Sequence, residues 1–477
     1  MWRKFGGGAQ ARLVAGGGPF DRGIDPGWAG PITGFRFSSR RMPPPPSSLT
    51  PSPNSARRVL LASLAGTTIE FFDFYIYATA AVLVFPRLFF PNSDPASATL
   101  QSFATFAIAF IARPIGSAVF GHFGDRIGRK ATLVAALLTM GLSTVAIGLL
   151  PVYASIGILA PILLALCRFG QGLGLGGEWG GAVLLATENA PPGKRAWYGM
   201  FPQLGAPLGF FCSGGIFLLL TETMSNAEFL RFGWRIPFIA SSLLVFVGLY
   251  VRLKISETPV FQKARDRDER VALPLLTVWR EHTRAVILGT VMATATFVLF
   301  YFLTVFCLSW GTTKLGYSRA HFLLVQMAGI VFFALTIPYS AVLADRHGRR
   351  FTLILVTALI AVYGLVFASL FNAGPSGVLV AMILGLALMG MTYGPLGTLL
   401  SELFPTGVRY TGSSISFNLA GIFGASLAPY IATWLATHYG LGAVGCYLSG
   451  ASLLTLVGLI LSRGTPEAAF AEAPPVV

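Results

Sequence analysis

Charged residues are scarce in this chain. They make up 11% of its 477 residues, whereas about a quarter of the residues of a soluble domain are charged. The four cysteines lie in apolar stretches without CxxC spacing, and the five histidines show no paired ligand spacing. A disulfide framework and a metal site are therefore excluded, and we interpret the cysteines as small buried hydrophobic residues.

The sequence also lacks the motifs of several membrane activities. No Walker sequence (G-x-x-x-x-G-K-[ST]) is present, which excludes ATP-driven transport. No Ser/His/Asp or metal constellation indicates an enzyme, and neither a selectivity filter nor rings of pore charges indicate a channel. We therefore expect neither an enzyme nor a channel, and no cofactor.

Long apolar stretches are what the chain does have. It is 54% hydrophobic with a mean hydropathy of +0.69, and about 20 apolar residues suffice to cross a bilayer. We predict an all-α membrane protein with twelve transmembrane helices. The expected spans are 59–86, 100–121, 131–150, 157–186, 197–221, 236–253, 285–310, 321–343, 351–371, 377–401, 410–436 and 442–462.

A charged motif occurs twice between these spans. Residues 121–130 read GHFGDRIGRK and residues 341–350 read AVLADRHGRR, so both contain Asp-Arg-x-Gly-Arg. Each half also has a glutamate seven residues before an arginine, namely Glu188 before Arg195 and Glu402 before Arg409. The repeats predict two homologous, pseudo-symmetric six-helix bundles, an architecture typical of secondary transporters.

The net charge of +15 is unevenly distributed. If both termini are cytoplasmic, the inner loops and the adjoining span ends from Arg57 onward hold 20 lysines and arginines, and the outer loops hold five. This is the positive-inside asymmetry of membrane proteins, so the basic charge reports topology and not nucleic-acid binding. We expect a multi-pass protein of the bacterial inner (plasma) membrane with both termini in the cytoplasm.

The spans divide the chain into five predicted parts. These are a disordered N-terminal segment (1–57), an N-terminal six-helix bundle (58–253), a cytoplasmic linker (254–284), a C-terminal six-helix bundle (285–463) and a short tail (464–477). The first segment is rich in Gly, Pro, Ser and Arg and has too little apolar surface to fold. It is a cytoplasmic tail, a transit-like leader, or the product of a misassigned start, with Met42 as the true first residue.

The repeated charges predict a cytoplasmic gate. Asp125 lies near the end of the second span, where it can accept hydrogen bonds from the N-terminus of a neighbouring helix. The simpler interpretation, charges that only anchor the topology, does not explain why the same residues recur at the same spacing. We expect ion pairs that close this side and break as the halves rock. The predicted gate residues are Asp125, Arg126, Arg129, Glu188, Arg195, Asp345, Arg346, Arg349, Glu402 and Arg409.

Two carboxylates lie in the first span. Glu70 and Asp73 are three residues apart, so they share one face of a helix. Two carboxylates this close disfavour joint ionisation, and we expect one to keep its proton near neutral pH. The pair is a candidate site for a coupled proton. The alternative is that one carboxylate is permanently paired with Arg113 or Arg168 and joins two helices.

Two arginines also lie inside spans, where a charge costs about 2.5–3.5 kcal/mol. Arg113 precedes Pro114, which can kink the helix and aim the guanidinium. An arginine facing a central cavity can bind a carboxylate bidentately, and Arg168 can also pair with the proton-carrying acid. The alternative is that either arginine is only an internal counter-ion. The predicted substrate-binding residues are Arg113, Arg168, Glu178, Gln203, Tyr393 and Asn418.

The loop motifs resemble those of the major facilitator superfamily, although Ala341 stands where the first copy has Gly121. A closer resemblance is to its metabolite:proton symporter family, which includes shikimate, 2-oxoglutarate and proline–betaine transporters. The resembling stretches are AGTTIEFFDFYIYATAA (65–81), RPIGSAVFGHFGDRIGRK (113–130), CRFGQGLGLGGEWGGAVLLATE (167–188), FGWRIPFIASSLLVFVGLYVRLKISETPVF (232–261) and SELFPTGVRYTGSSISFNLAGIFGASLAP (401–429).

The resemblance implies the major facilitator fold, a Glu-x-x-Asp pair in the first span, and an organic acid or a zwitterionic osmolyte as substrate. Two membrane-embedded arginines favour the anion. We therefore expect a proton-coupled symporter that imports a small organic acid by alternating access, with H+ as the coupling ion. The alternatives are uptake of a zwitterion such as proline or betaine, and a transporter-like sensor. The lipid bilayer is the other expected partner, and no motif indicates an oligomer, so we expect a monomer.

Overall fold

The computed structural model describes residues 56–127, 129–188, 190–191, 193–254, 274–405 and 408–462, with the backbone alone for 56–59, 121–127, 129–133, 185, 188, 251–254 and 274. Within these ranges the regular structure is entirely helical. The predictions for the N-terminal segment, most of the linker and the C-terminal tail concern residues outside the described part and stay predictions.

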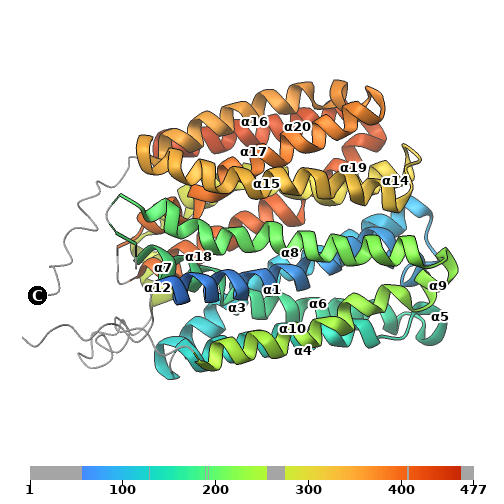
Figure 1. Cartoon of the computed structure of the whole chain (residues 1–477), viewed down its shortest axis with the longest axis horizontal. Helices are drawn as coiled ribbons and strands as arrows, with labels where there is room; N and C mark the ends of the chain where they lie inside the picture. The colour runs from blue at the N-terminus through green and yellow to red at the C-terminus, as the bar shows by residue number, and fades with distance from the viewer. Residues whose placement is uncertain are drawn as a thin grey trace, which may run out of the picture. The chain divides into compact units, whose positions relative to one another are not determined.

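Helices of the first half run from blue to green in Figure 1. They are α1 (Ala56–Leu83), α2 (Phe85–Leu88), α3 (Pro95–Ile127), α4 (Arg129–Leu149), α5 (Tyr153–Ile156), α6 (Leu159–Gly176), α7 (Trp179–Glu188), α8 (Arg195–Thr223), α9 (Asn226–Arg231), η1 (Gly233–Arg235) and α10 (Ile236–Lys254). A short helix, α12 (Pro274–Glu281), lies within the expected linker.

The second half runs from yellow to red. Its helices are α13 (Thr283–Tyr301), η2 (Phe302–Phe306), α14 (Cys307–Thr313), α15 (Arg319–His347), α16 (Arg349–Phe371), α17 (Gly374–Glu402), α18 (Arg409–Ala420), η4 (Gly421–Ser426), α19 (Ala428–Tyr439) and α20 (Leu441–Leu461). The stretches η2 and η4 are π-helical turns inside continuous spans, a feature that is frequent at functional sites.

Ten helical spans in the described part are long and apolar enough to cross a membrane. Two further long helices, α1 with 28 residues and α4 with 21, occupy the expected first and third spans. Helices of this length are required because a backbone in hydrocarbon must satisfy its own hydrogen bonds. The predicted all-α membrane protein is confirmed.

The two halves pack their helices in the same pattern. In the first half α1 packs against α8, α3 against α6 and α4 against α10; in the second, α13 packs against α18, α15 against α17 and α16 against α20. Figure 1 shows α4 beside α10 and α16 beside α20. These pairs occupy equivalent places in the order of spans, so the pseudo-symmetry predicted from the repeated motif is confirmed. Across the halves, α8 packs against α15, and α3 against α18 and η4.

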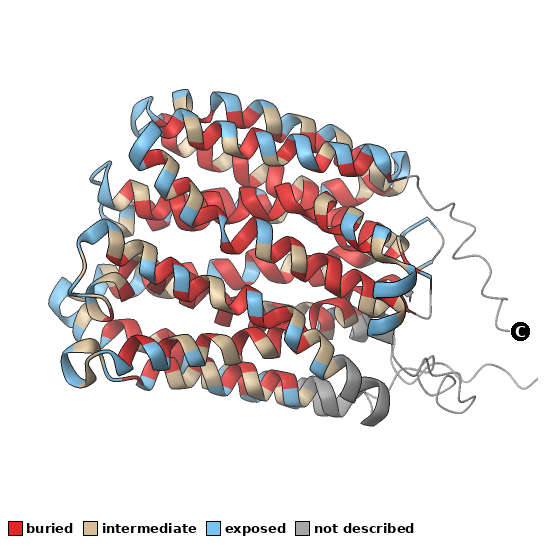
Figure 2. Cartoon of the chain, turned by 180° about the vertical axis from the view of Figure 1, so that it is seen from behind, coloured by how far each residue is buried: buried red, intermediate tan, exposed pale blue. Residues whose placement is uncertain are grey.

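Exposed residues recur along the peripheral helices (Figure 2), and many of them are large and apolar. Leu142 of α4, Phe246 of α10 and Leu365 of α16 are 66%, 69% and 66% exposed. Lipid chains cover such side chains, whereas exposed apolar surface of this extent drives association in water. The span from α13 to α14 is the opposite case: 94% of its most apolar window is buried, against 39–67% for the other nine spans. It therefore lies at the centre of the fold.

Glycines bring α3 and α6 very close together. A Cβ at Gly172 would lie 2.3 Å from the carbonyl oxygen of Ala109 and 2.8 Å from the Cβ of Ala112, and one at Gly176 would lie 2.0 Å from the carbonyl oxygen of Arg113. The two glycines are four residues apart, which is the small-xxx-small spacing of closely packed membrane helices. This contact fixes α3, and with it Arg113, against α6.

We expect Gly172→Ala to destabilise the protein by about 1–3 kcal/mol, the usual cost of overpacking, because the added methyl group meets backbone of α3. Gly450→Ala is the matched control: nothing lies within 4 Å of its Cβ position, and alanine favours a helix over glycine by about 1 kcal/mol. Thermal unfolding in detergent measures both variants. An unfolding midpoint for Gly172→Ala that matches or exceeds the wild type would contradict the close approach.

Candidate functional site

A central cavity of about 20 Å³ lies between the two halves. Nine of its sixteen lining residues are aromatic, and Glu70 and Arg113 supply one charge of each sign. In this state the cavity has room for about one water molecule, and a chemical group that enters it meets flat apolar walls and two opposite charges. The lining residues are Glu70, Phe71, Tyr75, Arg113, Leu175, Trp179, Ala206, Thr296, Phe297, Phe300, Tyr301, Phe333, Met389, Tyr393, Phe417 and Asn418.

Arg113 of α3 is 4% exposed and lies against aromatic rings. Its guanidinium carbon is 4.6 Å from the ring centre of Phe74 and 4.7 Å from that of Phe110. These contacts are cation–π interactions and leave the edges of the guanidinium for other groups. Within the described part of the chain, Nε and Nη2 have no hydrogen-bond partner. A buried donor pair of this kind matches a carboxylate.

Arg168 of α6 is fully buried but does not line the central cavity. Its guanidinium carbon lies 4.3 Å from the ring centre of Phe74, 4.0 Å from that of Tyr77 and 4.9 Å from that of Phe106. The sequence predicted Arg168 as a substrate-binding and a proton-coupling residue. In this structure it lies behind a layer of rings, of which Phe74 is shared with Arg113.

Asp73 of α1 is fully buried in the first half. Its carboxylate accepts hydrogen bonds from the hydroxyl groups of Ser241 (2.5 Å) on α10 and Thr144 (3.3 Å) on α4. Thr144 in turn accepts a hydrogen bond from the Gln171 amide (2.7 Å), whose oxygen accepts one from Arg168 (2.8 Å). Asp73 makes no ion pair with a described residue, so its link to Arg168 runs through Gln171 and Thr144.

The two carboxylates of the first span therefore have different surroundings. Glu70 lines the central cavity beside Arg113, while Asp73 is enclosed by α4 and α10. Glu178 lies at the break between α6 and α7, is 3% exposed, and is not among the cavity-lining residues. Of the three acids, Glu70 is thus the one that can meet a ligand in the central cavity.

Contacts within the first half and across the two halves surround the central cavity. The indole N–H of Trp179 donates to the side chain of Gln203 (3.1 Å), whose amide donates to the carbonyl oxygen of Tyr393 (3.0 Å). Trp179 also stacks on Phe417, with ring centres 3.6 Å apart. The amide of Asn418 donates to the hydroxyl of Ser117 (2.9 Å). Gln203, Tyr393 and Asn418, predicted as substrate-binding residues, all connect the two halves here.

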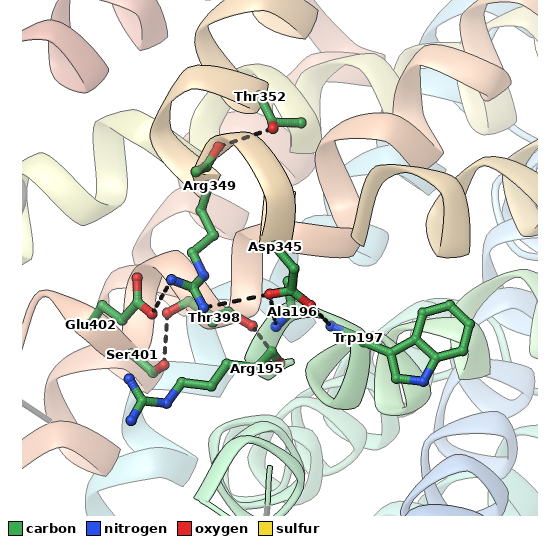
Figure 3. Close-up of polar contacts among 10 residues, drawn as sticks. Arg195, Ala196, Trp197, Asp345, Arg349, Thr352, Thr398, Ser401 and Glu402 are labelled. Carbon is green, nitrogen blue, oxygen red and sulfur yellow. Dashed lines mark hydrogen bonds and ion pairs between the residues drawn. The ribbon is translucent and has the colours of Figure 1, made fainter. Parts of the chain in front are cut away.

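One end of the bundle, which we call the Asp345 end, is held closed by a latch between the halves (Figure 3). The carboxylate of Asp345 accepts hydrogen bonds from the backbone N–H groups of Ala196 (3.0 Å) and Trp197 (2.9 Å), in the first turn of α8. These N–H groups have no partner inside the helix, and the helix dipole favours a negative charge there. Arg349 pairs with both Asp345 (3.5 Å) and Glu402 (3.2 Å).

The other predicted gate residues are placed as follows. The carbonyl oxygen of Arg195 accepts a hydrogen bond from Thr398 across the halves (3.4 Å), and Arg409 donates to the carbonyl oxygen of Phe404 (3.1 Å). Arg346 is exposed. The side chains of Asp125, Arg126, Arg129 and Glu188 lie outside the described residues, so their predicted ion pairs stay predictions.

The opposite end, which we call the Arg319 end, contains a much larger cavity. Its volume is about 810 Å³, and both halves line it, with Arg87 on one side and Arg319 on the other. Arg319 donates to the side chain of Asn226 on α9 (2.8 Å). The structure is therefore closed at the Asp345 end and hollow at the Arg319 end, which is the arrangement of one state of an alternating-access cycle.

Comparison with known proteins agrees with this architecture. Residues 63–429 match the family model described as Major Facilitator Superfamily, which is well over half of the chain. The chain belongs to the major facilitator superfamily. The resemblance seen in the sequence is confirmed. The repeated loop motif, the two halves and the latch at Asp345 are the features of this chain as a member of that superfamily.

Curated relatives in this superfamily are named as transporters and not as enzymes, as the sequence predicts. The inner membrane metabolite transport protein YhjE of Escherichia coli K12 is 59% identical over 86% of this chain and 95% of its own length. The shikimate transporter of the same strain is 34% identical over 89% of this chain and 98% of its own. The proline/betaine transporter of E. coli K12 is 33% identical over 80% of this chain and 77% of its own length.

Solved structures support the fold. The xylose transporter XylE from E. coli, in a partially occluded inward-open conformation, superposes with a TM-score of 0.68 over 86% of this chain and 98% of that one. The two sequences are 18% identical, so the likeness concerns the fold alone. This superfamily member is therefore a multi-pass membrane protein whose relatives transport metabolites.

Proposed function

We propose that this protein is a proton-coupled symporter that imports a small organic acid by alternating access. Arg113 carries the proposal: it lines the central cavity, is almost completely buried, and has two guanidinium nitrogens without a described partner. Leaving such donors unsatisfied is costly, and a carboxylate is the group that fits them bidentately. The metabolite-transport names of the relatives support the same activity.

Coupling follows from the charges that share the cavity. A carboxylate bound at Arg113 lies in the same small space as Glu70, and two negative charges this close disfavour each other unless one is protonated. Substrate binding and proton uptake therefore favour each other. A carboxylate also needs at least one proton to enter against an inside-negative potential. The coupling ion is H+, and the proposal requires no cofactor.

The orientation in the membrane, the membrane itself and the oligomeric state are part of the same proposal. We assign the Asp345 end to the cytoplasm and the Arg319 end to the outside, because the Lys/Arg excess lies in the loops on the Asp345 side. Both termini are then cytoplasmic, in a bacterial inner membrane. The protein works as a monomer in this proposal, since one chain supplies both halves of the cavity.

A zwitterionic osmolyte is the second candidate substrate. The observation that favours it is the pairing of Arg113 with Glu70 in one cavity walled by aromatic rings, since such rings bind quaternary ammonium groups by cation–π attraction. Relatives named as proline/betaine transporters support it as well. The organic acid is preferred because Arg113 has unsatisfied donors.

Uptake into proteoliposomes with an imposed pH gradient tests the proposal. The probes are radiolabelled shikimate, 2-oxoglutarate, citrate and benzoate, with proline and betaine, and empty liposomes are the control. We expect one of the acids to accumulate when the outside is acidic and the accumulation to collapse with a protonophore. Accumulation of proline or betaine alone would replace the organic acid by a zwitterion. No uptake by folded protein would overturn transport and favour a sensor.

A further inference from the structure

A continuous hydrogen-bonded path joins the two charges buried deepest in the first half. It runs from Asp73 on α1 to Thr144 on α4, then to Gln171 and Arg168 on α6. All four side chains are fully buried, and we call them the Asp73 relay. A buried polar chain of this kind costs stability unless each member is satisfied, so its presence at the centre of a transporter half calls for a role.

Thr144 is the member of the relay whose hydrogen bonding changes with the protonation state of Asp73. Its hydroxyl has one hydrogen and two acceptors within reach, the Asp73 carboxylate at 3.3 Å and the carbonyl oxygen of Met140 at 3.0 Å. An ionised Asp73 can only accept, so Thr144 donates to it. A protonated Asp73 can donate instead, and Thr144 then turns its hydrogen to Met140. The two acceptors correspond to the two protonation states of Asp73.

Gln171 passes this change to Arg168. When Thr144 donates to an anion, its oxygen becomes a better acceptor for the Gln171 amide, and the Gln171 oxygen a better acceptor for Arg168, because bonds in a chain polarise one another. When Asp73 carries the proton, it donates to the second lone pair of the Thr144 oxygen, and the Gln171 bond loses the polarisation that the anion supplied. Arg168 is therefore held more strongly when Asp73 is ionised than when it is protonated.

Arg168 is in turn linked to the central cavity. Its guanidinium and that of Arg113 both lie against the ring of Phe74, at 4.3 Å and 4.6 Å from the ring centre. Movement of Arg168 changes the surface on which Arg113 rests. The path from the relay to the substrate-binding arginine thus consists of packed and hydrogen-bonded groups throughout, as coupling between two sites requires.

Other charged groups face Asp73 from the helices packed around α1. Glu178, at the break before α7, interacts with it electrostatically. Arg168 lies at the far end of the relay, Arg113 on α3 lies beyond Phe74, and Glu70 is on α1 itself. From α4 and α10 come the hydroxyl groups of Thr144 and Ser241. A pH response that belongs to Asp73 must therefore be separated from that of Glu70 and Glu178.

We propose that Thr144 and Gln171 are positioning residues that couple the proton on Asp73 to substrate binding at Arg113, through Arg168 and Phe74. This inference rests on the proposed proton symport and deepens it. It gives Asp73 the role of sensing the proton away from the substrate, while Glu70 meets the substrate directly.

The test compares three threonine variants in proteoliposomes. Thr144→Val keeps the side-chain shape and removes the hydroxyl, Thr144→Ser keeps the hydroxyl, and Thr139→Val is the control. Thr139 lies on the same helix and donates only within it, to the carbonyl oxygen of Ala135. The measurement is the apparent KM of whichever radiolabelled acid the wild type accumulates, from mildly acidic to mildly alkaline outside pH.

We expect the wild-type KM to rise with pH, by the roughly five- to 150-fold that is typical of coupling between two sites. Thr144→Val should lose the part of this dependence that Asp73 supplies and keep the part that Glu70 supplies, whereas Thr144→Ser and Thr139→Val should keep all of it. A wild-type pH dependence in Thr144→Val would overturn the inference and leave proton symport standing. Wild-type uptake that does not depend on the pH gradient would overturn proton symport itself, and with it the inference that rests on it.

A second variant covers the case in which Thr144→Val does not fold. Gln171→Met preserves the length of the side chain and removes both relay hydrogen bonds, and it should flatten the KM profile in the same way. A Gln171→Met protein with the full wild-type profile would contradict the relay whatever the state of Thr144→Val. Elution as a single species in size-exclusion chromatography establishes folding for each variant.

Discussion

Arg113→Ala should lower kcat/KM for the transported acid at least about 30-fold. Removing one partner of a buried charge pair costs about 2–5 kcal/mol, and each 1.4 kcal/mol is about a factor of ten. Arg113 is the one cation among the residues that line the central cavity, so no other described guanidinium there can replace it. Initial uptake rates over a range of substrate concentrations measure the effect, which should appear mainly in KM.

Arg113→Lys separates charge from geometry. Lysine keeps the positive charge but has no planar fork, so it should recover part of the affinity and not the whole of it. Lys314→Ala is the control, because Lys314 is exposed and is not among the residues that line either cavity. If Arg113→Ala, shown to be folded, transports with the wild-type KM, the substrate does not bind at Arg113 and the proposed organic acid loses its main support.

Much of this fold could be predicted from the sequence because it depends on local composition. The span expected at 236–253 is α10 (Ile236–Lys254), and the one expected at 351–371 is α16 (Arg349–Phe371). Helix length and hydropathy suffice for such segments. The π-helical turns at 302–306 and 421–426 left no signal in the hydropathy, since they change the hydrogen-bonding pattern and leave the apolar composition as it was.

The charged residues of the site could be identified from the sequence because a charge inside a membrane is energetically costly and therefore indicates a function or a charged partner. Arg113, Asp73 and Arg168 were identified in this way, and the structure encloses each of them in the first half. Thr144 and Ser241 were missed, since hydroxyl residues are common in apolar spans and most donate within their own helix. Whether a hydroxyl meets Asp73 depends on how α4 and α10 are rotated about their axes, which the sequence alone does not determine.

The motif at Asp345 shows which part of a contact a sequence repeat predicts and which part it does not. The sequence predicted that Asp125 accepts hydrogen bonds from the N-terminus of a neighbouring helix. The structure describes this contact for its repeat partner, Asp345, with α8 as the helix. The spacing indicated the acceptor but not the helix that donates, because that helix lies in the other half and is brought there only by the packing of α8 against α15.

Asp345→Asn should open the Asp345 end and slow transport at least about tenfold. Asparagine is uncharged and offers one acceptor oxygen, so it cannot reproduce both bonds to the first turn of α8 or the pairing with Arg349. Hydrogen bonds to a charged group contribute about 1.5–3 kcal/mol each, so losing one shifts an equilibrium between closed and open states about ten- to 100-fold. Transport slows because the cycle must close this end in every turn.

Alkylation of a cysteine at position 398 measures the opening directly. Thr398 is 1% exposed, and its hydroxyl donates across the halves to the carbonyl oxygen of Arg195. In a background without the four native cysteines, Thr398→Cys should react with N-ethylmaleimide at least about ten times faster when Asp345→Asn is added, following the population of the open state. Detergent-solubilised protein is used so that both ends are accessible to the reagent.

Arg346→Gln is the matched control for the latch. It removes a charge from the next residue of the same helix, but Arg346 is exposed and no hydrogen bond or ion pair joins it to a described residue. Alkylation at position 398 should therefore stay at the wild-type rate in this variant. Equal rates in Asp345→Asn and Arg346→Gln would mean that the contact of Asp345 with α8 does not hold the end closed. Closure would then rest on the apolar packing of α8 against α15, and the repeated motif would need another explanation.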